Sequence, residues 1–142
     1  FRVDTFITIE HDKPPEDAIV DGRFKDNYLW QTDSNNQETV GLVQERLKGK
    51  KVDLLFIDAD HSYGAVRKDW ELYSPFVVEG GIVLFHDILY VDPSCQVKLL
   101  WEQLKRVYPY VEVNIGPGST GLGWVYYSDK PELTVAHKTF TL

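Results

Sequence analysis

Two short apolar segments constrain the fold of this 142-residue chain more than any other feature. Val52–Ile57 (VDLLFI) and Ile82–Phe85 (IVLF) are almost wholly apolar, which is typical of strands that a parallel sheet buries on both faces. Gly80–Gly81 separates the second segment from a predicted helix. The apolar face of that helix repeats at helical spacing: Val66, Trp70, Tyr73 and Val77. A strand, a helix and a second strand in this order predict a parallel βαβ unit.

The same alternation extends to both sides of this unit. Further strands are predicted at Thr5–Glu10, Tyr28–Thr32, Val111–Ile115 and Leu122–Tyr127. One further helix is expected to begin at an N-cap Asn35, with Glu38 as its capping-box partner, and to end at Gly49. Another is expected to begin at Asp92-Pro93, with proline in the first position. Its predicted buried stripe comprises Val97, Leu100, Trp101, Leu104 and Tyr108.

The last two predicted strands are joined only by Gly116–Gly121, which is too short for a crossover helix, so we expect them to be antiparallel. The sequence therefore predicts an α/β fold: a Rossmann-like, doubly wound, mostly parallel sheet with a C-terminal antiparallel hairpin. We expect residues 1–142 to form a single, partial domain, truncated at its N-terminus. No structure is predicted for the tail, residues 130–142.

Charge and composition narrow the classes of partner. The net charge of −7 disfavours nucleic acid as a partner, since such proteins present a basic face. No apolar run approaches the ~18 residues that span a bilayer, so no membrane partner is expected. The single cysteine, Cys95, fits a reducing compartment, and we expect a cytoplasmic protein. Cys95 lies at a predicted helix start but has no evident base partner, so we interpret it as inert.

An acidic residue ends or follows each of the four predicted parallel strands. These residues are Glu10, Asp33, Asp58 and Asp87. Because ligands of such sheets bind outside the carboxyl ends of the strands, we expect the four acids to mark a functional edge. Glu10 is expected to accept hydrogen bonds from a cofactor ribose, and Asp33 with Ser34 from a base. The structural alternatives stay open, with Glu10 as a solvated strand end and Asp33 as the start of the next helix.

Asp58 and Asp87 follow successive strands, so we expect them to be neighbours. Two carboxylates suit Mg²⁺ or a similar ion, which keeps waters for a substrate to displace. His61 and His86 lie close by in the sequence and are candidate general bases, because imidazole titrates near neutral pH. A loop histidine at position 61 and a structural histidine at position 86 are the alternatives.

A specific resemblance lies in VDLLFIDADHSYGAVRKDWELYSPFVVEGGIVLFHDI, residues Val52–Ile88. It resembles the small-molecule O-methyltransferase-like group of class I S-adenosylmethionine-dependent methyltransferases, related to antibiotic-tailoring and catechol-type enzymes. The weaker flanking similarity extends the resemblance over residues 5–127. It implies that Glu10 binds the cofactor ribose, that Asp33 and Ser34 lie by the adenine, and that Asp58 lies beside the cofactor.

The resemblance also implies a chemistry. Asp58 and Asp87 match acids that bind a divalent metal in metal-dependent members, while Asp60 and His61 match positions near the acceptor hydroxyl. His86 belongs to the His-Asp pair of the group. Catechol-type members have asparagine after the second acid, where this chain has Ile88, so His86 or Asp60 would have to complete a three-ligand site. The expected reaction is methyl transfer to a small-molecule hydroxyl, assisted by Mg²⁺.

The resemblance departs at the front of the chain. The glycine-rich motif and first strand of the family have no counterpart before Thr5, so we expect weak or absent cofactor binding by this chain and activity in the intact parent. An unfilled strand position would favour a homo-oligomer. A non-methylating tailoring enzyme of the same group and a non-catalytic binding or assembly module remain alternatives. A dinucleotide-dependent dehydrogenase is disfavoured, because no G-x-G-x-x-G motif is present.

Overall fold

The structure is a computed structural model that describes residues 5–10, 26–114, 116, 118–131 and 137–141, with side chains described only within 32–131. The chain divides into two compact units, residues 1–49 and residues 50–142. The prediction of a single domain therefore stays a prediction, and each unit is described by itself.

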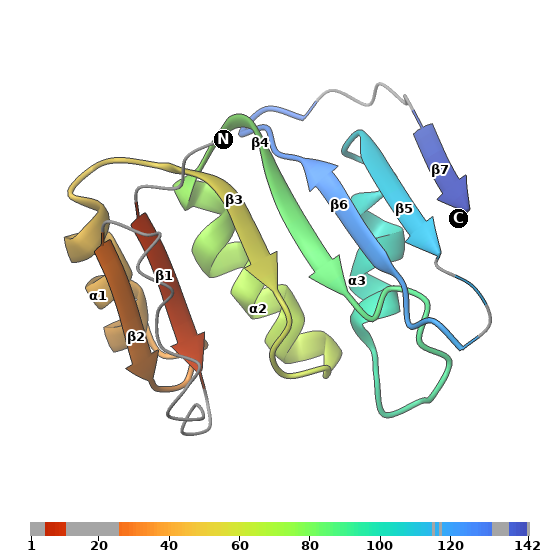
Figure 1. The fold of residues 1–142 in the computed structure, drawn as a ribbon, viewed down its shortest axis with the longest axis horizontal. Coiled ribbons are helices and arrows are strands. Elements are labelled where there is room, and N and C mark those ends of the chain that lie inside the picture. The colour runs from red at the N-terminus through yellow and green to blue at the C-terminus, as the bar shows by residue number, and fades with distance from the viewer. Residues whose placement is uncertain (1–4, 11–25, 115, 117, 132–136, 142) are drawn as a thin grey trace. The chain divides into compact units, whose positions relative to one another are not determined.

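The first unit contains two parallel strands and a helix (Figure 1). Strand β1 (Thr5–Glu10) pairs with β2 (Asp26–Gln31) in parallel register, so their carboxyl ends coincide at Glu10 and Gln31. Helix α1 (Gln37–Leu47) follows. Its N-cap is Asn36, whose side chain accepts from the Glu38 backbone N–H, so the predicted N-cap at Asn35 is wrong. Asn35 instead donates its own N–H to the Asp33 carboxylate.

The second unit is built on a five-stranded sheet in the order β3-β4-β6-β5-β7. The strands are β3 (Val52–Ile57), β4 (Val77–His86), β5 (Tyr110–Asn114), β6 (Leu122–Tyr126) and β7 (His137–Thr141). Strands β3 and β4 are parallel, and β6 runs antiparallel to both β4 and β5. The predicted βαβ unit and antiparallel hairpin are confirmed. Strand β7, parallel to β5, falls in the tail for which the sequence predicted no structure.

Helices α2 (Tyr63–Tyr73) and α3 (Val97–Leu104) lie on the same side of this sheet (Figure 1). A 3₁₀ turn, η1 (Ser74–Phe76), ends the run of α2, and Val77 already belongs to β4 rather than to the helical face. Between sheet and helices lies one apolar core. Its most deeply buried large side chains are Trp101, Phe85, Ile88, Val66, Val77, Val83 and Val125.

Two sequence expectations about this unit are wrong for identifiable reasons. Helix α3 begins at Val97 rather than at Pro93, because Asp92 forms a separate turn in which its carboxylate accepts from the Ser94 N–H. Within the second unit taken by itself, β3 is covered on one face only, because α2 and α3 lie on the same side of the sheet (Figure 1). Leu54 and Phe56 accordingly keep 53% and 49% of their surface exposed.

Candidate active site

The carboxyl ends of β3 and β4 lie side by side. Their parallel register pairs Ile57, the last residue of β3, with Phe85. Asp58 then leaves β3 while His86 closes β4 and Asp87 follows it. The expected neighbourhood of the two acids therefore arises from the strand register itself, since parallel strands end at one edge of the sheet.

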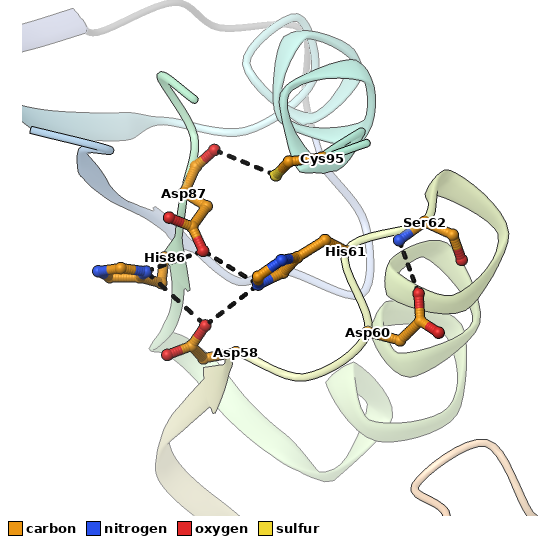
Figure 2. A network of polar contacts seen from close by, with 7 residues as sticks. All are labelled: Asp58, Asp60, His61, Ser62, His86, Asp87 and Cys95. Atoms are coloured by element: carbon orange, nitrogen blue, oxygen red, sulfur yellow. Dashed lines mark hydrogen bonds and ion pairs between the residues drawn. The ribbon is translucent and has the colours of Figure 1, made fainter. Parts of the chain in front are cut away.

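Four side chains meet at this edge (Figure 2). His61 Nε2 and His86 Nδ1 each lie 3.0 Å from the same oxygen, Asp87 Oδ2. They lie 3.8 Å and 3.7 Å from Asp58 Oδ1. Figure 2 shows the two imidazole rings on opposite sides of the carboxylate pair. Each imidazole thus contacts the Asp87 carboxylate and approaches that of Asp58.

Asp87 is the most enclosed member of this cluster, with 7% of its surface exposed, whereas Asp58, His61 and His86 are considerably more open. Burial opposes ionisation of Asp87, but hydrogen bonds from His86 and Thr120 outweigh it and hold the pKa of the carboxyl below its ordinary value. Its carboxylate is therefore the negative centre around which the cluster is organised.

The backbone of Asp87 has a φ of +61°, in the left-handed region that aspartate tolerates better than most residues. The chain after it is held at two points. The Tyr90 N–H donates to the Asp87 carbonyl at 3.2 Å, and the Leu89 N–H donates to the Thr120 carbonyl at 2.8 Å. A turn between β4 and α3 thus aims the Asp87 side chain at the end of β3. Such backbone conformations persist where the surrounding structure enforces them.

His61 is positioned by the start of α2. Ser62 is the N-cap of that helix and accepts from the Ala65 N–H. Gln96 holds the same loop from the other side, because its N–H donates to the His61 carbonyl at 2.7 Å and its Oε1 accepts from the Tyr63 N–H at 3.1 Å. No sequence pattern indicates this role for Gln96, which lies 35 residues away from His61 along the chain.

The structure separates Asp60 from the other predicted catalytic residues. Its Oδ1 accepts from the Ser62 N–H at 2.7 Å, a turn at the start of α2 (Figure 2). The other predicted residues belong to the first unit. Asp33 accepts from the Asn35 N–H, and Ser34 Oγ lies 3.4 Å from the Asn35 side-chain nitrogen. The side chain of Glu10 lies outside the described residues.

The donor set fits a divalent cation. Asp58, His61 and Asp87 each offer a ligand atom, and these atoms all lie within 4.8 Å of one another. His86 Nδ1 adjoins both carboxylates. Ile88, at the position where asparagine would offer an oxygen, is fully buried in the apolar core and supplies no ligand. Carboxylate and imidazole therefore provide the available ligand chemistry in the described part of the site.

A shallow hollow of about 210 Å³ opens beside His86. The β5–β6 turn forms most of its wall, and the lining residues are His86, Val113, Gly118, Ser119, Thr120, Gly121 and Leu122. The sequence predicts only a hairpin turn for this segment and does not indicate its place beside His86. No described helix is long and apolar enough to cross a membrane.

Comparisons with known proteins were made against families, curated proteins and solved structures. Residues 3–88 match the model of a methyltransferase domain family. The uncharacterized protein y4gI of Sinorhizobium fredii is 30% identical over 81 residues, which cover 57% of this chain and 9% of that protein. The uncharacterized protein R132 of Acanthamoeba polyphaga mimivirus is 47% identical over 36 residues, 25% of this chain and 16% of that protein.

Among solved structures, the fold resembles the MycE methyltransferase of the mycinamycin biosynthetic pathway. A complex of MycE with Mg and SAH aligns with a TM-score of 0.53 and 16% identity, over 84% of this chain and 35% of that one. A complex that also holds mycinamycin VI gives a TM-score of 0.52 and 17% identity. The chain thus spans about a third of MycE and smaller shares of the curated relatives.

The fold and the family match agree with each other. The neighbours confirm a Rossmann-like α/β fold, and the family match includes β3, β4 and both strand-end acids. The chain belongs to the methyltransferase domain family, as its resemblance to class I S-adenosylmethionine-dependent enzymes predicts.

Proposed function

We propose that this chain serves S-adenosylmethionine-dependent methyl transfer to a hydroxyl group of a small molecule, with a divalent cation at the carboxyl ends of β3 and β4. One observation carries the proposal: two imidazole nitrogens lie 3.0 Å from Asp87 Oδ2, beside the Asp58 carboxylate, in a chain of the methyltransferase domain family. MycE, a structural neighbour, was solved with Mg and SAH, which supports the same combination here.

Asp58 and Asp87 would hold the cation, because both carboxylates face the centre of the cluster. A cation bound there would lower the pKa of an acceptor hydroxyl and fix the position of its oxygen. The acceptor would enter beside His86, where the hollow lined by the β5–β6 turn opens. On the sequence-based assignment, the cofactor ribose would bind Glu10, and the adenine would lie by Asp33 and Ser34. Asp58 would lie beside the cofactor.

The chain's own contribution to the reaction is to orient the acceptor and take its proton. The acceptor oxygen forms a bond to the methyl carbon while the carbon–sulfur bond breaks, and the hydroxyl proton passes to an imidazole. We assign proton acceptance to His61 or His86, which face the centre of the cluster. Asp60 is a weaker candidate, because its carboxylate accepts from the Ser62 N–H at the start of α2.

The test is calorimetric titration of S-adenosylhomocysteine into the chain, with and without Mg²⁺. Binding in the micromolar range would support the cofactor assignment. Asp58→Asn should then weaken S-adenosylhomocysteine binding. Asp53→Asn, which changes an exposed acid on β3 itself, should leave that binding unchanged. Absence of binding, both here and in a longer protein that includes this chain, would overturn the proposal in favour of a binding or assembly module. Binding without methyl transfer to any hydroxyl would favour a non-methylating tailoring enzyme.

A further inference from the structure

We propose that the hollow beside His86 selects an uncharged, hydroxyl-bearing ring as the acceptor and rejects an anionic one, because the neutral β5–β6 turn forms most of its wall. This inference rests on the proposed function and names the chemical class of its acceptor. The turn joins Asn114, the last residue of β5, to Leu122, the first residue of β6. Its composition, its hydrogen-bonding groups and its place beside the proposed cation support the proposal.

The turn belongs to the longest stretch of the chain without a charged side chain. Residues 113–128 contain no Asp, Glu, Lys or Arg, although 26% of the chain is charged. Burial explains neutral residues within β6, but residues 118–120 of the turn keep part of their surface exposed. A second hollow, formed by the loop after β4 and the start of α3, has both Asp92 and Lys98 in its lining. The neutral wall therefore distinguishes the hollow beside His86.

The lining combines apolar surface with neutral hydrogen-bonding groups. Val113 and Leu122 contribute aliphatic side chains, and Ser119 and Thr120 contribute hydroxyls. Ser119 Oγ accepts from the Gly121 N–H at 3.1 Å and keeps a proton that it can donate. Specific small-molecule sites commonly pair apolar surface with a few polar groups in this way. An uncharged ring with hydroxyl substituents can use both kinds of surface.

The hollow adjoins the proposed cation site. His86 belongs to its lining and lies 3.0 Å from Asp87 Oδ2 through Nδ1, while Leu122 pairs with His86 in the register of β4 and β6. The Thr120 side chain also hydrogen-bonds to Asp87. The volume of about 210 Å³ is below the roughly 300–1,000 Å³ of pockets that enclose a drug-sized ligand. A single ring of the acceptor therefore suits the hollow.

The charges around the hollow disfavour an anionic acceptor. No Lys or Arg belongs to its described lining. A divalent cation held by Asp58 and Asp87 would be balanced by their two carboxylates, and the whole chain carries a net charge of −7. An anionic group that entered the hollow would lose water without gaining a countercharge. A neutral hydroxyl would find partners in the turn, so the same surface discriminates between the two acceptors by charge.

The test uses pairs of probes that differ in charge but little in shape. The amide and carboxylate forms of meta-hydroxybenzoic acid represent an aromatic acceptor, and glucuronamide and glucuronate represent a sugar. We would titrate each probe into the full chain with Mg²⁺ present and follow the backbone amide resonances of Ser119, Thr120 and Leu122. The amide should bind at least about fivefold more tightly than the carboxylate. The pair that causes the larger shifts identifies the kind of ring.

Variants that add one positive charge sharpen this test. Ser119→Lys and Leu122→Lys each place the charge in the lining of the hollow. Val91→Lys adds the same charge outside it, at a side chain that is 90% exposed, and is the matched control. Each hollow variant should shift the affinity ratio toward the carboxylate by about threefold, an effect that high salt removes, whereas Val91→Lys should not. Thermal unfolding checks that each variant is folded.

Equal affinities for the amide and the carboxylate in the wild type would overturn the inference. The absence of any probe-induced shift in the turn, or an equal effect of Val91→Lys, would overturn it as well. S-adenosylhomocysteine binding together with equal probe affinities would reject only the selection by charge. Selective binding of the neutral probes, in a chain that binds no S-adenosylhomocysteine here or within a longer protein, would reject only the proposed methyl transfer. The two conclusions therefore fail separately.

Discussion

The loop after β2 and the loop after β3 begin alike and are used differently. Each carries an aspartate just after a parallel strand and leads into a helix with a polar N-cap, Asn36 in one and Ser62 in the other. Asp33 accepts from the N–H two residues ahead, and Asp60 does the same in the second loop. Asp58 instead faces two histidines.

This difference teaches that a strand-end acid locates an edge of the sheet without determining its use. An aspartate whose carboxylate meets the N–H two residues on is part of a local turn. The second loop has two aspartates, so Asp60 can fill that role while Asp58 remains available for a ligand. The neighbouring end of β4 supplies the remaining groups, His86 and Asp87.

The largest expected effect tests whether the two loops truly differ in ion binding. Asp58→Asn should weaken Mg²⁺ binding by at least about 10-fold, because loss of a ligand costs at least as much as loss of an outer-shell partner. Asp33→Asn, the matched change in the other loop, should leave Mg²⁺ affinity within error. Calorimetry measures both, and equal losses would contradict the proposed difference between the loops.

A second prediction concerns the β5–β6 turn, which supports the segment after β4. A Cβ at Gly121 would lie 2.6 Å from Leu89 Cγ, whereas one at Gly118 would meet nothing within 4 Å, and both residues have positive φ. Both alanine variants carry backbone strain, but Gly121→Ala adds overpacking against the segment after Asp87. Urea denaturation should show Gly121→Ala less stable than Gly118→Ala by roughly 2 kcal/mol. Equal stabilities would show that this contact relaxes freely.

The helix caps offer a third comparison. Asn36→Ala and Ser62→Ala should each cost about 1 kcal/mol of unfolding free energy, because each removes a side-chain acceptor for a helix N–H. Only Ser62→Ala should also weaken Mg²⁺ binding, since this cap closes the loop that carries Asp58. If Asn36→Ala changed ion affinity to the same degree, the proposed separation of roles would be wrong.

The smallest effect is on the pH dependence of stability. The lowered pKa of Asp87 means that its carboxylate contributes stability above the pKa of the unfolded chain, and that this contribution is lost as the pH falls through the folded-state pKa. In chelator, wild-type stability should therefore fall more between about pH 5 and pH 2 than that of Asp87→Asn. Parallel curves from denaturant melts would contradict the assigned interactions.

Much of the fold and of the edge that carries the site could be predicted from the sequence. The apolar runs ending at Ile57 and Phe85 placed Asp58 and Asp87 on neighbouring strands, which the register confirms. Local sequence patterns did not determine where α3 begins or which face of β3 is covered, because both depend on the tertiary arrangement. The helix predicted from Pro93 begins at Val97, because Asp92 closes a turn of its own, and the exposed face of β3 depends on which side the helices cover.

The contacts within the cluster at the ends of β3 and β4 could not be predicted from the sequence. Neither the approach of His61 and His86 to one oxygen nor the support of His61 by Gln96 has a sequence signal, because both depend on distances between segments far apart in the chain. Strand β7 was missed because a five-residue edge strand without apolar continuity resembles a loop. The roles of Glu10, Asp33 and Ser34 stay predictions.

The left-handed backbone of Asp87 makes that position a point where selection for stability and selection for chemistry compete. Glycine adopts a φ of +61° at no steric cost, so Asp87→Gly would relieve the backbone while deleting the carboxylate that both histidines contact. A population freed from the need to bind an ion would be expected to drift toward glycine or asparagine there. Retention of aspartate in natural variants would then be a sign of continued catalytic use.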